Sequence, residues 1–338
     1  MLKDRDFAYK KLNALMKKRS RKVLQKFGQA AFSRVNDPLL LSILREVKAY
    51  WKDNFRPALT SFCCEAVGGK PDAADDVSLM ITLTSAGGGI HDDLIDKSLN
   101  KHFRMTVLGL HGIDYALLVG DLLILEGWMM AKELVKKNYQ PEKFADIIEV
   151  FGNWTIDVCE AEFMEISCRR NLDTDLEHYQ KILWKSMADT EAGAKLGAII
   201  GNGSGQEVQA LAEFGSRLGF MFRLANDVKD TLNMEGNLQN RLQYESVPLP
   251  MLYAAKSSGE RYFQIKSILG KPALDPMDLR KLLEFCFETE AFAYVLRIAK
   301  QNKKQASRTL NLLRPSAGRD ALTLMLEKSL ADIMNLCF

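Results

Sequence analysis

The sequence predicts an all-α protein built as a single large helical bundle. Almost every segment places its apolar residues at helical spacing. Alternating β-branched runs and hairpin turns, which mark strands, are nearly absent. Breaks that contain glycine or proline divide the chain into helices of roughly 15–30 residues. These three observations together favour a bundle of many helices over any mixed fold.

The predicted helices are separated by short segments rich in turn-forming residues. No change of composition marks a linker and no internal repeat is evident, so we predict one domain over residues 1–338 with ten or more helices. The breaks fall at residues 36–38, 68–71, 138–141, 201–205, 248–250, 257–259, 270–272 and 314–318.

Composition excludes several functional classes. The 338 residues are 47% hydrophobic and 26% charged, which is ordinary for a soluble globular chain. The net charge of +3, without a long basic stripe, argues against nucleic acid as the main partner. The apolar run 115–131 contains Asp121 and Glu126 and is too short to span a bilayer. With no signal peptide and no CxxC pair among six cysteines, we expect a cytoplasmic protein.

The first element, predicted over residues 1–30, is a basic helix. It carries ten Lys or Arg against two Asp before residue 27. One interpretation is attraction of this helix to an anionic membrane surface, as a peripheral contact. The other is a solvated helix that packs on the bundle, since charged faces are usually just exposed to water.

A helix that ends near residue 96 contains the first candidate site. Its stretch 85–96, SAGGGIHDDLID, combines three glycines with three carboxylates. Each glycine costs about 0.5–1 kcal/mol of helix stability relative to alanine, and neighbouring carboxylates repel one another unless a cation lies among them. Residues four apart share a helix face, so Asp92 and Asp96 point the same way and Asp93 lies about 100° round the helix. This pattern suits a hard divalent cation.

A second acidic cluster occupies a later helix, in the stretch 222–230, FRLANDVKD. Asn226 and Asp230 are again four apart, and Asp227 is adjacent to Asn226. A bundle can aim two such helices at each other across a central cavity, which would hold two or three Mg²⁺ ions and a diphosphate. Lys185, on a third helix, could neutralise the charge of a leaving group there. The alternative for each cluster alone is a solvated acidic turn.

These motifs resemble those of the trans-isoprenyl diphosphate synthase (polyprenyl synthetase) family over residues 40 to 330. The stretch 91–96, HDDLID, is similar to the first aspartate-rich motif of the family, and 219–230, GFMFRLANDVKD, is similar to the second. Gly120-Asp121 before an apolar helix, and Lys185-Ser186 before Leu196-Gly197-Ala198, resemble further family segments in order and spacing.

The resemblance implies an isoprenoid synthase-like bundle around a deep central cavity, and Mg²⁺-assisted ionisation of an allylic prenyl diphosphate. In the synthases, isopentenyl diphosphate then attacks the allylic cation and the chain grows by five carbons. The resemblance also implies a homodimer. On that model Asp92, Asp93, Asp96 and Lys185 carry catalysis, and Asp92, Asp96, Asn226 and Asp230 hold Mg²⁺. With the residues present in this chain, including those that depart from the family, we predict substrate binding by Arg56, Lys101, Arg104, Lys185, Arg223, Asp227, Gly87 and Gly88.

The departures from the family concentrate in the region that binds isopentenyl diphosphate. Asp53 stands where the family has a lysine, and Ser85 where it has His or Gln. The paired arginines after the first motif become Lys101 and His102, and a lysine expected in 245–250 is absent. A carboxylate in a diphosphate pocket repels the ligand, and losing arginine removes bidentate phosphate recognition.

Extra carboxylates mark the predicted inner wall of the cavity. Asp189, Glu191, Glu162 and Glu165 occupy positions where the family has other residues or a different acid. Such groups could steer or quench a carbocation. The alternative is that Asp189 pairs with Lys185, four residues earlier, as an ordinary contact along a helix.

Three functions follow from this pattern. The first is a prenyltransferase that elongates an allylic diphosphate with isopentenyl diphosphate to a medium or long product. The second is a class I terpene synthase or lyase that ionises a prenyl diphosphate alone. The third is a non-catalytic partner subunit of a heteromeric synthase. Gly87 and Gly88 lie about one turn before Asp92, where bulky family residues limit chain growth, so we predict room there for a long chain. The alternative is close packing of a neighbouring helix against these glycines.

Overall fold

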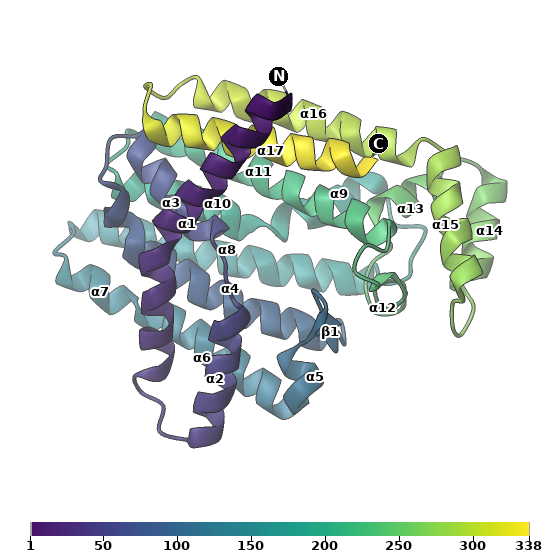
Figure 1. Ribbon diagram of the computed structural model, residues 1–338, viewed down its shortest axis with the longest axis horizontal. Coiled ribbons are helices and arrows are strands. Elements are labelled where there is room, and N and C mark those ends of the chain that lie inside the picture. Colours follow the sequence, from purple (N-terminus) through teal and green to yellow (C-terminus); the bar gives the residue numbers. More distant parts are fainter. Residues whose placement is uncertain (1, 338) are drawn as a thin grey trace.

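The computed structural model describes residues 2–337, and within them almost every element is helical (Figure 1). The first half contains α1 (Leu2–Phe32), α2 (Pro38–Tyr50), α3 (Phe55–Ala66), the 3₁₀ turn η1 (Pro71–Ala74), α4 (Asp75–Ile95), strands β1 (Asn100–Lys101) and β2 (Arg104–Met105), α5 (Val107–His111), α6 (Ile113–Met129), α7 (Ala131–Lys136) and α8 (Pro141–Ser167). The second half contains α9 (Leu176–Lys185), α10 (Ala188–Ile200), α11 (Gly205–Thr231), α12 (Leu238–Tyr244), α13 (Leu249–Ala255), α14 (Gly259–Leu269), α15 (Pro276–Glu288), α16 (Ala291–Leu310) and α17 (Ala317–Cys337). The all-α prediction is confirmed.

Local sequence signals explain where many helices begin. Ser204 and Glu207 form a capping box at the start of α11, in which each side chain accepts a hydrogen bond from the other residue's backbone N–H. Asp175 caps α9 by accepting from the N–H groups of Glu177 and His178. Proline occupies the first turn of α2, α8 and α15, where its missing N–H costs no helical hydrogen bond. The predicted breaks at 36–38, 138–141 and 201–205 contain the starts of α2, α8 and α11, whereas no break was predicted before α9.

Long helices form the centre of the bundle. α10 packs against α3, α8 and α11, while α11 also packs against α16 and α17. Figure 1 shows most of these helices running in a similar direction, with α14 and α15 at one end. The side chains of α10 and α11 that face the interior include Leu196, Phe214 and Phe220, which are fully buried. At 25 cal/mol per Å², each such side chain contributes about 1.5–3 kcal/mol on burial.

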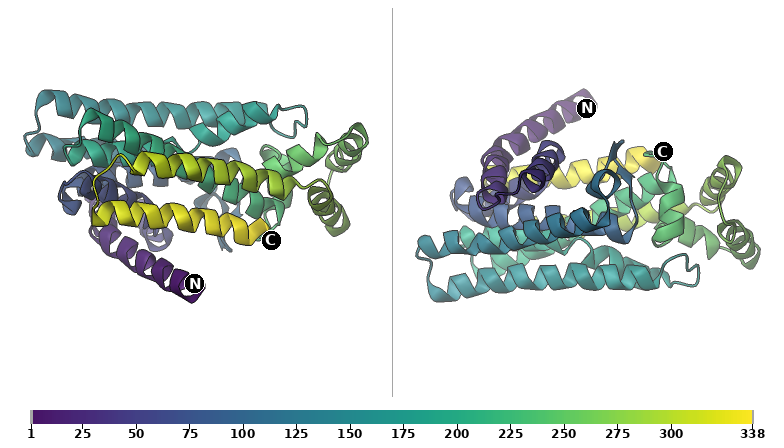
Figure 2. Two further views of the ribbon diagram at one scale, coloured as in Figure 1. Left: turned by 90° about the horizontal axis from the view of Figure 1, so that it is seen from above. Right: turned by 90° about the horizontal axis from the view of Figure 1, so that it is seen from below.

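The basic helix α1 packs on the bundle along one face and projects beyond it at the N-terminal end (Figure 2). Val23 and Phe27 are buried. Arg19 pairs with Glu65 at 2.5 Å and Lys26 pairs with Asp76 at 2.9 Å. Part of its positive charge therefore holds the helix to the bundle, which favours the packing interpretation; membrane contact stays a prediction. Met1 lies outside the described residues. Among residues 2–337, no helix combines the length and the apolar character needed to cross a bilayer.

A short hairpin follows the first acidic cluster and was not predicted. β1 and β2 pair antiparallel, with Lys101 opposite Arg104, and the turn residues His102 and Phe103 both have positive φ angles near 55°. Thr106 ends the hairpin by donating its hydroxyl to the Ser98 carbonyl at 2.7 Å. The hairpin thereby returns over the C-terminal end of α4.

The glycines of α4 have different surroundings. A Cβ added to Gly87 would lie 2.5 Å from the Gly120 carbonyl oxygen of α6, while a Cβ added to Gly88 would meet no atom within 4 Å. The prediction that Gly87 widens the cavity is therefore wrong, because α6 packs directly on its backbone. Gly88 has no such neighbour, and room for a long chain beside it stays a prediction.

We expect opposite results from alanine at these two adjacent positions. Gly87→Ala should lower the free energy of unfolding by about 1–3 kcal/mol, because the new methyl group overpacks the contact with α6. Gly88→Ala should leave it unchanged or raise it by about 0.5–1 kcal/mol, because alanine favours the helix. Urea unfolding of both variants measures the difference. Equal effects would contradict the close approach of α4 and α6.

Candidate active site

The two predicted acidic clusters face one cavity of about 180 Å³. Asp92 of α4 and Asp96, which caps the C-terminal end of α4, belong to its lining, and α11 contributes Asn226 and Asp230. The structure thus brings together two pairs of residues that lie more than 120 positions apart in the sequence. The complete lining is Asp92, Asp96, Ser98, Lys101, His102, Arg223, Asn226, Lys229, Asp230, Glu235, Asn237, Asn240, Arg241 and Glu245.

Lys101 neutralises the first cluster from the hairpin. Its Nζ donates to Asp92 Oδ2 at 2.8 Å and to Asp93 Oδ1 at 3.2 Å. Burial lowers the pKa of Lys101, but the carboxylates of Asp92 and Asp93 raise it more. The net result is a pKa well above the usual range of a lysine. Asp93 is itself buried beside the cavity. The ammonium is therefore permanently charged where it meets these two carboxylates.

Arg241 neutralises the second cluster from α12. Its side chain is only 4% exposed, and its guanidinium donates to Asp227 Oδ1 at 2.9 Å, to the Tyr179 hydroxyl at 3.0 Å and to the Asp230 carboxylate. Asp227 also accepts from the Tyr179 hydroxyl and from the Leu249 N–H, both at 2.9 Å. Every polar atom of the buried Asp227 carboxylate therefore has a partner, as burial of a charge requires.

This arrangement corrects the assignment of Asp227. The residue was predicted to contact substrate, but it is fully buried beneath the cavity and does not line it. Adjacent positions on a helix point about 100° apart, so Asn226 faces the cavity while Asp227 faces the core. Asp227 holds α9, α12 and the start of α13 against α11.

Among the described residues, Asp96 and Glu162 are carboxylates in or beside the cavity that form no ion pair. Burial, followed by repulsion from Asp92 and Glu245, raises the pKa of Asp96 to about 10. Burial and repulsion from Asp92 also raise the pKa of Glu162 to about 8. Because like charges crowd a partly desolvated space, this wall has an excess of oxygen donors that a divalent cation would relieve.

Of the three arginines predicted to bind substrate, Arg223 is the one that lines the cavity. Its Nη2 atom donates to both oxygens of Glu165 at 3.0 and 3.2 Å. Ser246 also donates to Glu165. The extra carboxylate at Glu165 thus anchors Arg223, which places the guanidinium at the wall rather than free in the cavity.

Three predicted substrate contacts lie outside the cavity. Lys185 donates from Nζ to Asp157 Oδ1 at 2.5 Å and to Glu160 Oε2 at 2.7 Å, so its charge is directed to α8. Arg56 pairs with Asp53 at 2.9 Å and with Asp189 at 2.5 Å. Arg104 stacks on the Tyr50 ring, with its guanidinium carbon 3.4 Å from the ring centre.

These placements correct three expectations. Lys185, Arg56 and Arg104 do not line the cavity among residues 2–337. The alternative for Asp189 is also wrong, because its partners are Arg56 and the Ser85 hydroxyl, at 3.1 Å, instead of Lys185. α9 ends at Lys185 and a new helix begins at Ala188, so the spacing of four residues does not correspond to one helical turn here.

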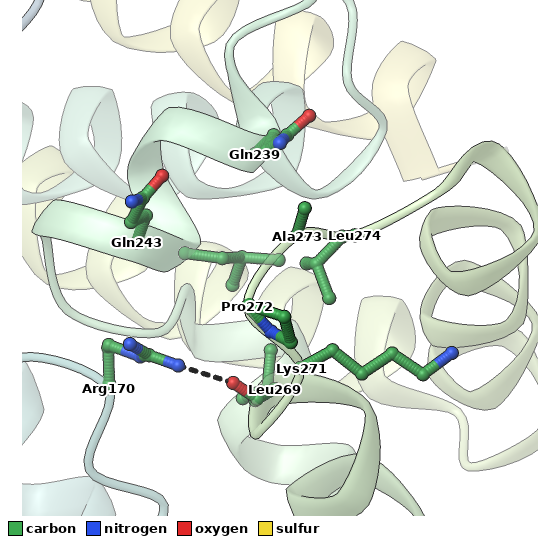
Figure 3. A pocket seen from close by; sticks show the side chains of 9 residues that line it. Arg170, Gln239, Gln243, Leu269, Lys271, Pro272, Ala273 and Leu274 are labelled. Carbon is green, nitrogen blue, oxygen red and sulfur yellow. Dashed lines mark hydrogen bonds between the residues drawn. The ribbon is translucent and has the colours of Figure 1, made fainter.

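A second, smaller hollow borders the side of α12 that faces away from Arg241. Figure 3 shows Gln239 and Gln243 of α12 above the segment Leu269–Leu274, with Arg170 donating to the Leu269 carbonyl at 2.5 Å. The hollow between them measures about 20 Å³, room for about one water molecule. Positions two apart on a helix point about 200° apart, so Gln239 and Gln243 line this hollow while Arg241 faces away from it.

Sequence reasoning missed Arg241, Lys229 and Glu245 as members of the cavity. Glu245 lies 3.8 Å from Arg241 Nε, four residues earlier. That i,i+4 pair of opposite charges, eleven residues after Asp230, is a signal in the sequence that would have indicated the helix bearing Arg241. Lys229 follows Asn226 by three positions and therefore shares its helix face.

Comparison with known proteins shows the family of the chain. Residues 42–286 match the sequence profile of the family described as polyprenyl synthetase. The chain belongs to this family. The curated relatives of this polyprenyl synthetase include a "Short chain isoprenyl diphosphate synthase" of Methanothermobacter thermautotrophicus, 27% identical over 90% of this chain and 95% of the relative. They also include a "Nonaprenyl diphosphate synthase" of Mycobacterium tuberculosis, 24% identical over 81% of each chain.

The fold is likewise shared with solved structures. A geranylgeranyl pyrophosphate synthetase from Pyrococcus horikoshii superposes with a TM-score of 0.84 at 22% identity, covering 96% of this chain and 99% of that one. The isoprenoid synthase-like fold is therefore confirmed. This polyprenyl synthetase is a polyprenyl diphosphate synthase-like transferase of isoprenoid biosynthesis.

The family implies Mg²⁺, and the chemistry of the cavity fits that ion. Asp92, Asp96, Asn226 and Asp230 offer oxygen atoms, the ligands that Mg²⁺ prefers. Within the part of the chain that the structure describes, no three His, Cys, Asp or Glu side chains converge as a metal cluster. Lys101 and Arg241 lie among the carboxylates instead. The donors thus fit Mg²⁺ by their chemical type, while their described arrangement is one in which Lys101 and Arg241 balance the carboxylates.

Proposed function

We propose that this chain elongates an allylic prenyl diphosphate with isopentenyl diphosphate, using Mg²⁺ held by Asp92, Asp96, Asn226 and Asp230. The observation that supports it is the meeting of the α4 and α11 clusters at one cavity. Bound Mg²⁺ would neutralise charge on the departing diphosphate. Lys101 and Arg223 would lie against that diphosphate from the hairpin and from α11.

The proposed reaction breaks an allylic carbon–oxygen bond, forms a carbon–carbon bond and releases a proton, which the departed diphosphate can accept. The allylic carbon–oxygen bond breaks and its electron pair leaves with the diphosphate. The double bond of isopentenyl diphosphate then forms the new carbon–carbon bond, and loss of a proton restores a double bond. Charge develops on the leaving oxygens, so fixed cations at the cavity wall stabilise the transition state more than the bound substrate.

The proposed product is a medium or long polyprenyl diphosphate. The curated relatives named above extend from short-chain to nonaprenyl synthases, so the family alone leaves length open. A Cβ added to Gly88, one turn before Asp92, would have no atom within 4 Å, which supports space for a hydrocarbon chain beside α4. Gly87 offers no such space.

A second candidate is a lyase or cyclase that ionises a prenyl diphosphate without isopentenyl diphosphate. The observation that favours it is the Arg56 cluster, in which Asp53 and Asp189 take up the guanidinium and Ser85 donates to Asp189. Two carboxylates already balance the charge of this arginine, so it attracts a second diphosphate only weakly. A non-catalytic subunit is disfavoured by the complete first cluster.

One assay separates these functions. Purified protein is incubated with Mg²⁺ and geranyl, farnesyl or geranylgeranyl diphosphate, with and without isopentenyl diphosphate, and both hydrocarbons and diphosphates are analysed. Longer diphosphates that appear only with isopentenyl diphosphate support elongation. Hydrocarbon or alcohol formed without it would instead establish the lyase. Inactivity that a second subunit rescues would identify the partner-subunit role.

We also propose that two copies of the chain pair through α6. This helix exposes an unusual number of large apolar side chains, including Ile113 at 67%, Leu118 at 62% and Leu125 at 61%. Leu118 and Leu125, seven positions apart, share one helix face. Exposed apolar side chains gathered on one face are typical of an interface, and a two-fold symmetric pair lets such a face cover the same face of a second copy.

The double variant Leu118→Glu, Leu125→Glu is therefore expected to be monomeric. Light scattering coupled to size exclusion measures the mass, which should equal two chains for the unmodified protein and one for the variant. Leu312→Glu, a change at an apolar residue exposed elsewhere, should leave the dimer intact. A monomeric unmodified protein would refute the interface.

A further inference from the structure

The cationic side chains of the cavity differ in whether each already forms an ion pair with a carboxylate. Lys101 pairs with Asp92 and Asp93, Arg223 with Glu165, and Arg241 with Asp227 and Asp230. His102, at the turn of the hairpin, meets Glu235 at 2.9 Å. Each of these groups would have to leave or share a partner before it could bind an incoming anion.

Lys229 is different from the others. It lines the cavity from α11 and is half-buried, yet across residues 2–337 no carboxylate lies within 4.0 Å of its ammonium group. It follows Asn226 by three positions and precedes Asp230 by one, so Lys229 and Asn226 share a helix face. Its charge is consequently available at the wall that the second cluster forms.

We propose that Lys229 binds the diphosphate of the substrate directly, as the cation of this cavity that reaches the anion without breaking an existing ion pair. The inference rests on the proposed function, because it takes the ligand of the cavity to be a prenyl diphosphate. Lysine suits this contact, since its ammonium is a compact point charge with three donors on a flexible stem.

The position of Lys229 also explains how the protein replaces Lys185. That lysine was expected to meet the diphosphate, but Asp157 and Glu160 hold it on α8. A trivalent or divalent phosphate anion requires several positive partners, because carboxylates dominate the cavity wall. Lys229 supplies one such positive charge from α11, beside Asn226 and Asp230.

The test uses inorganic pyrophosphate with Mg²⁺ as the probe, and measures its binding to the full chain by calorimetry. Lys229→Met should weaken binding about tenfold or more, as loss of a hydrogen bond to a charged group does, and Lys229→Arg should restore most of it. In turnover, Lys229→Met should raise KM for the allylic diphosphate more than it lowers kcat. Lys300→Met, which removes an exposed lysine on α16, controls for the change of net charge.

The outcomes separate this inference from the proposed function. Unchanged pyrophosphate affinity in Lys229→Met, together with loss of binding in Asp92→Asn, would overturn the role of Lys229 and leave the function standing. Unchanged affinity in both variants would overturn the function as well. An equal loss in Lys300→Met would show a general charge effect and would also overturn the assignment to Lys229.

Discussion

Replacing Asp92 by alanine should lower turnover about 10³-fold, which corresponds to roughly 4 kcal/mol of transition-state stabilisation. Asp92 lies at the end of α4, faces the cavity and accepts from Lys101. Its removal takes away an expected Mg²⁺ ligand and one partner of that lysine. Steady-state rates with a saturating allylic diphosphate and Mg²⁺ measure the effect.

Two controls accompany this variant. Asp146→Ala removes an exposed carboxylate from α8, far from the two clusters, and should keep full activity. Chelating Mg²⁺ with EDTA should abolish turnover of the unmodified protein, and added Mg²⁺ should restore it. If Asp92→Ala turned over at the normal rate while its circular dichroism stayed helical, the assignment of the first cluster to metal would be wrong.

Replacing Arg241 by methionine should destabilise the fold by about 3–5 kcal/mol. Asp227 is fully buried and Arg241 is its only cationic partner among the described residues. Loss of the guanidinium leaves that carboxylate in the core with only Tyr179 and the Leu249 N–H as donors. The midpoint of urea unfolding, followed by circular dichroism, measures the loss.

A double-mutant cycle tests the cause. Arg241→Met combined with Asp227→Leu removes both charges, so the double variant should be more stable than Arg241→Met alone, because no unpaired charge remains buried. A double variant whose loss equals the sum of the two single losses would show that the pair does not interact as its 2.9 Å contact indicates.

The sequence was informative about features that depend on near neighbours. Helical spacing and the turn-forming breaks predicted the all-α fold, and the spacing of four residues identified Asp92 with Asp96 and Asn226 with Asp230 as pairs that face one way. The hairpin at residues 100–105 escaped prediction, because two residues per strand are too few to show an alternating pattern.

The partners of individual charges could not be predicted in this way. Spacing along a helix gives the face of a side chain, but the group opposite that face comes from a distant part of the chain. Arg56 meets Asp189, 133 positions away, and Arg241 meets Tyr179, 62 positions away. The partners of Lys185 were missed for the same reason, since Asp157 and Glu160 lie on α8, more than 20 positions away.

The contact between Gly87 and Gly120 has a consequence for how the site tolerates change elsewhere. At this point α4 and α6 meet through main-chain atoms, and a Cβ on Gly120 would also collide with the His91 ring at 2.4 Å. A substitution changes a side chain and not the main chain. Substitutions of neighbouring apolar side chains should therefore leave the distance between α4 and α6 unchanged at this contact. His91 directly precedes Asp92, and this fixed spacing therefore protects the first carboxylate from drift as the surrounding core diverges.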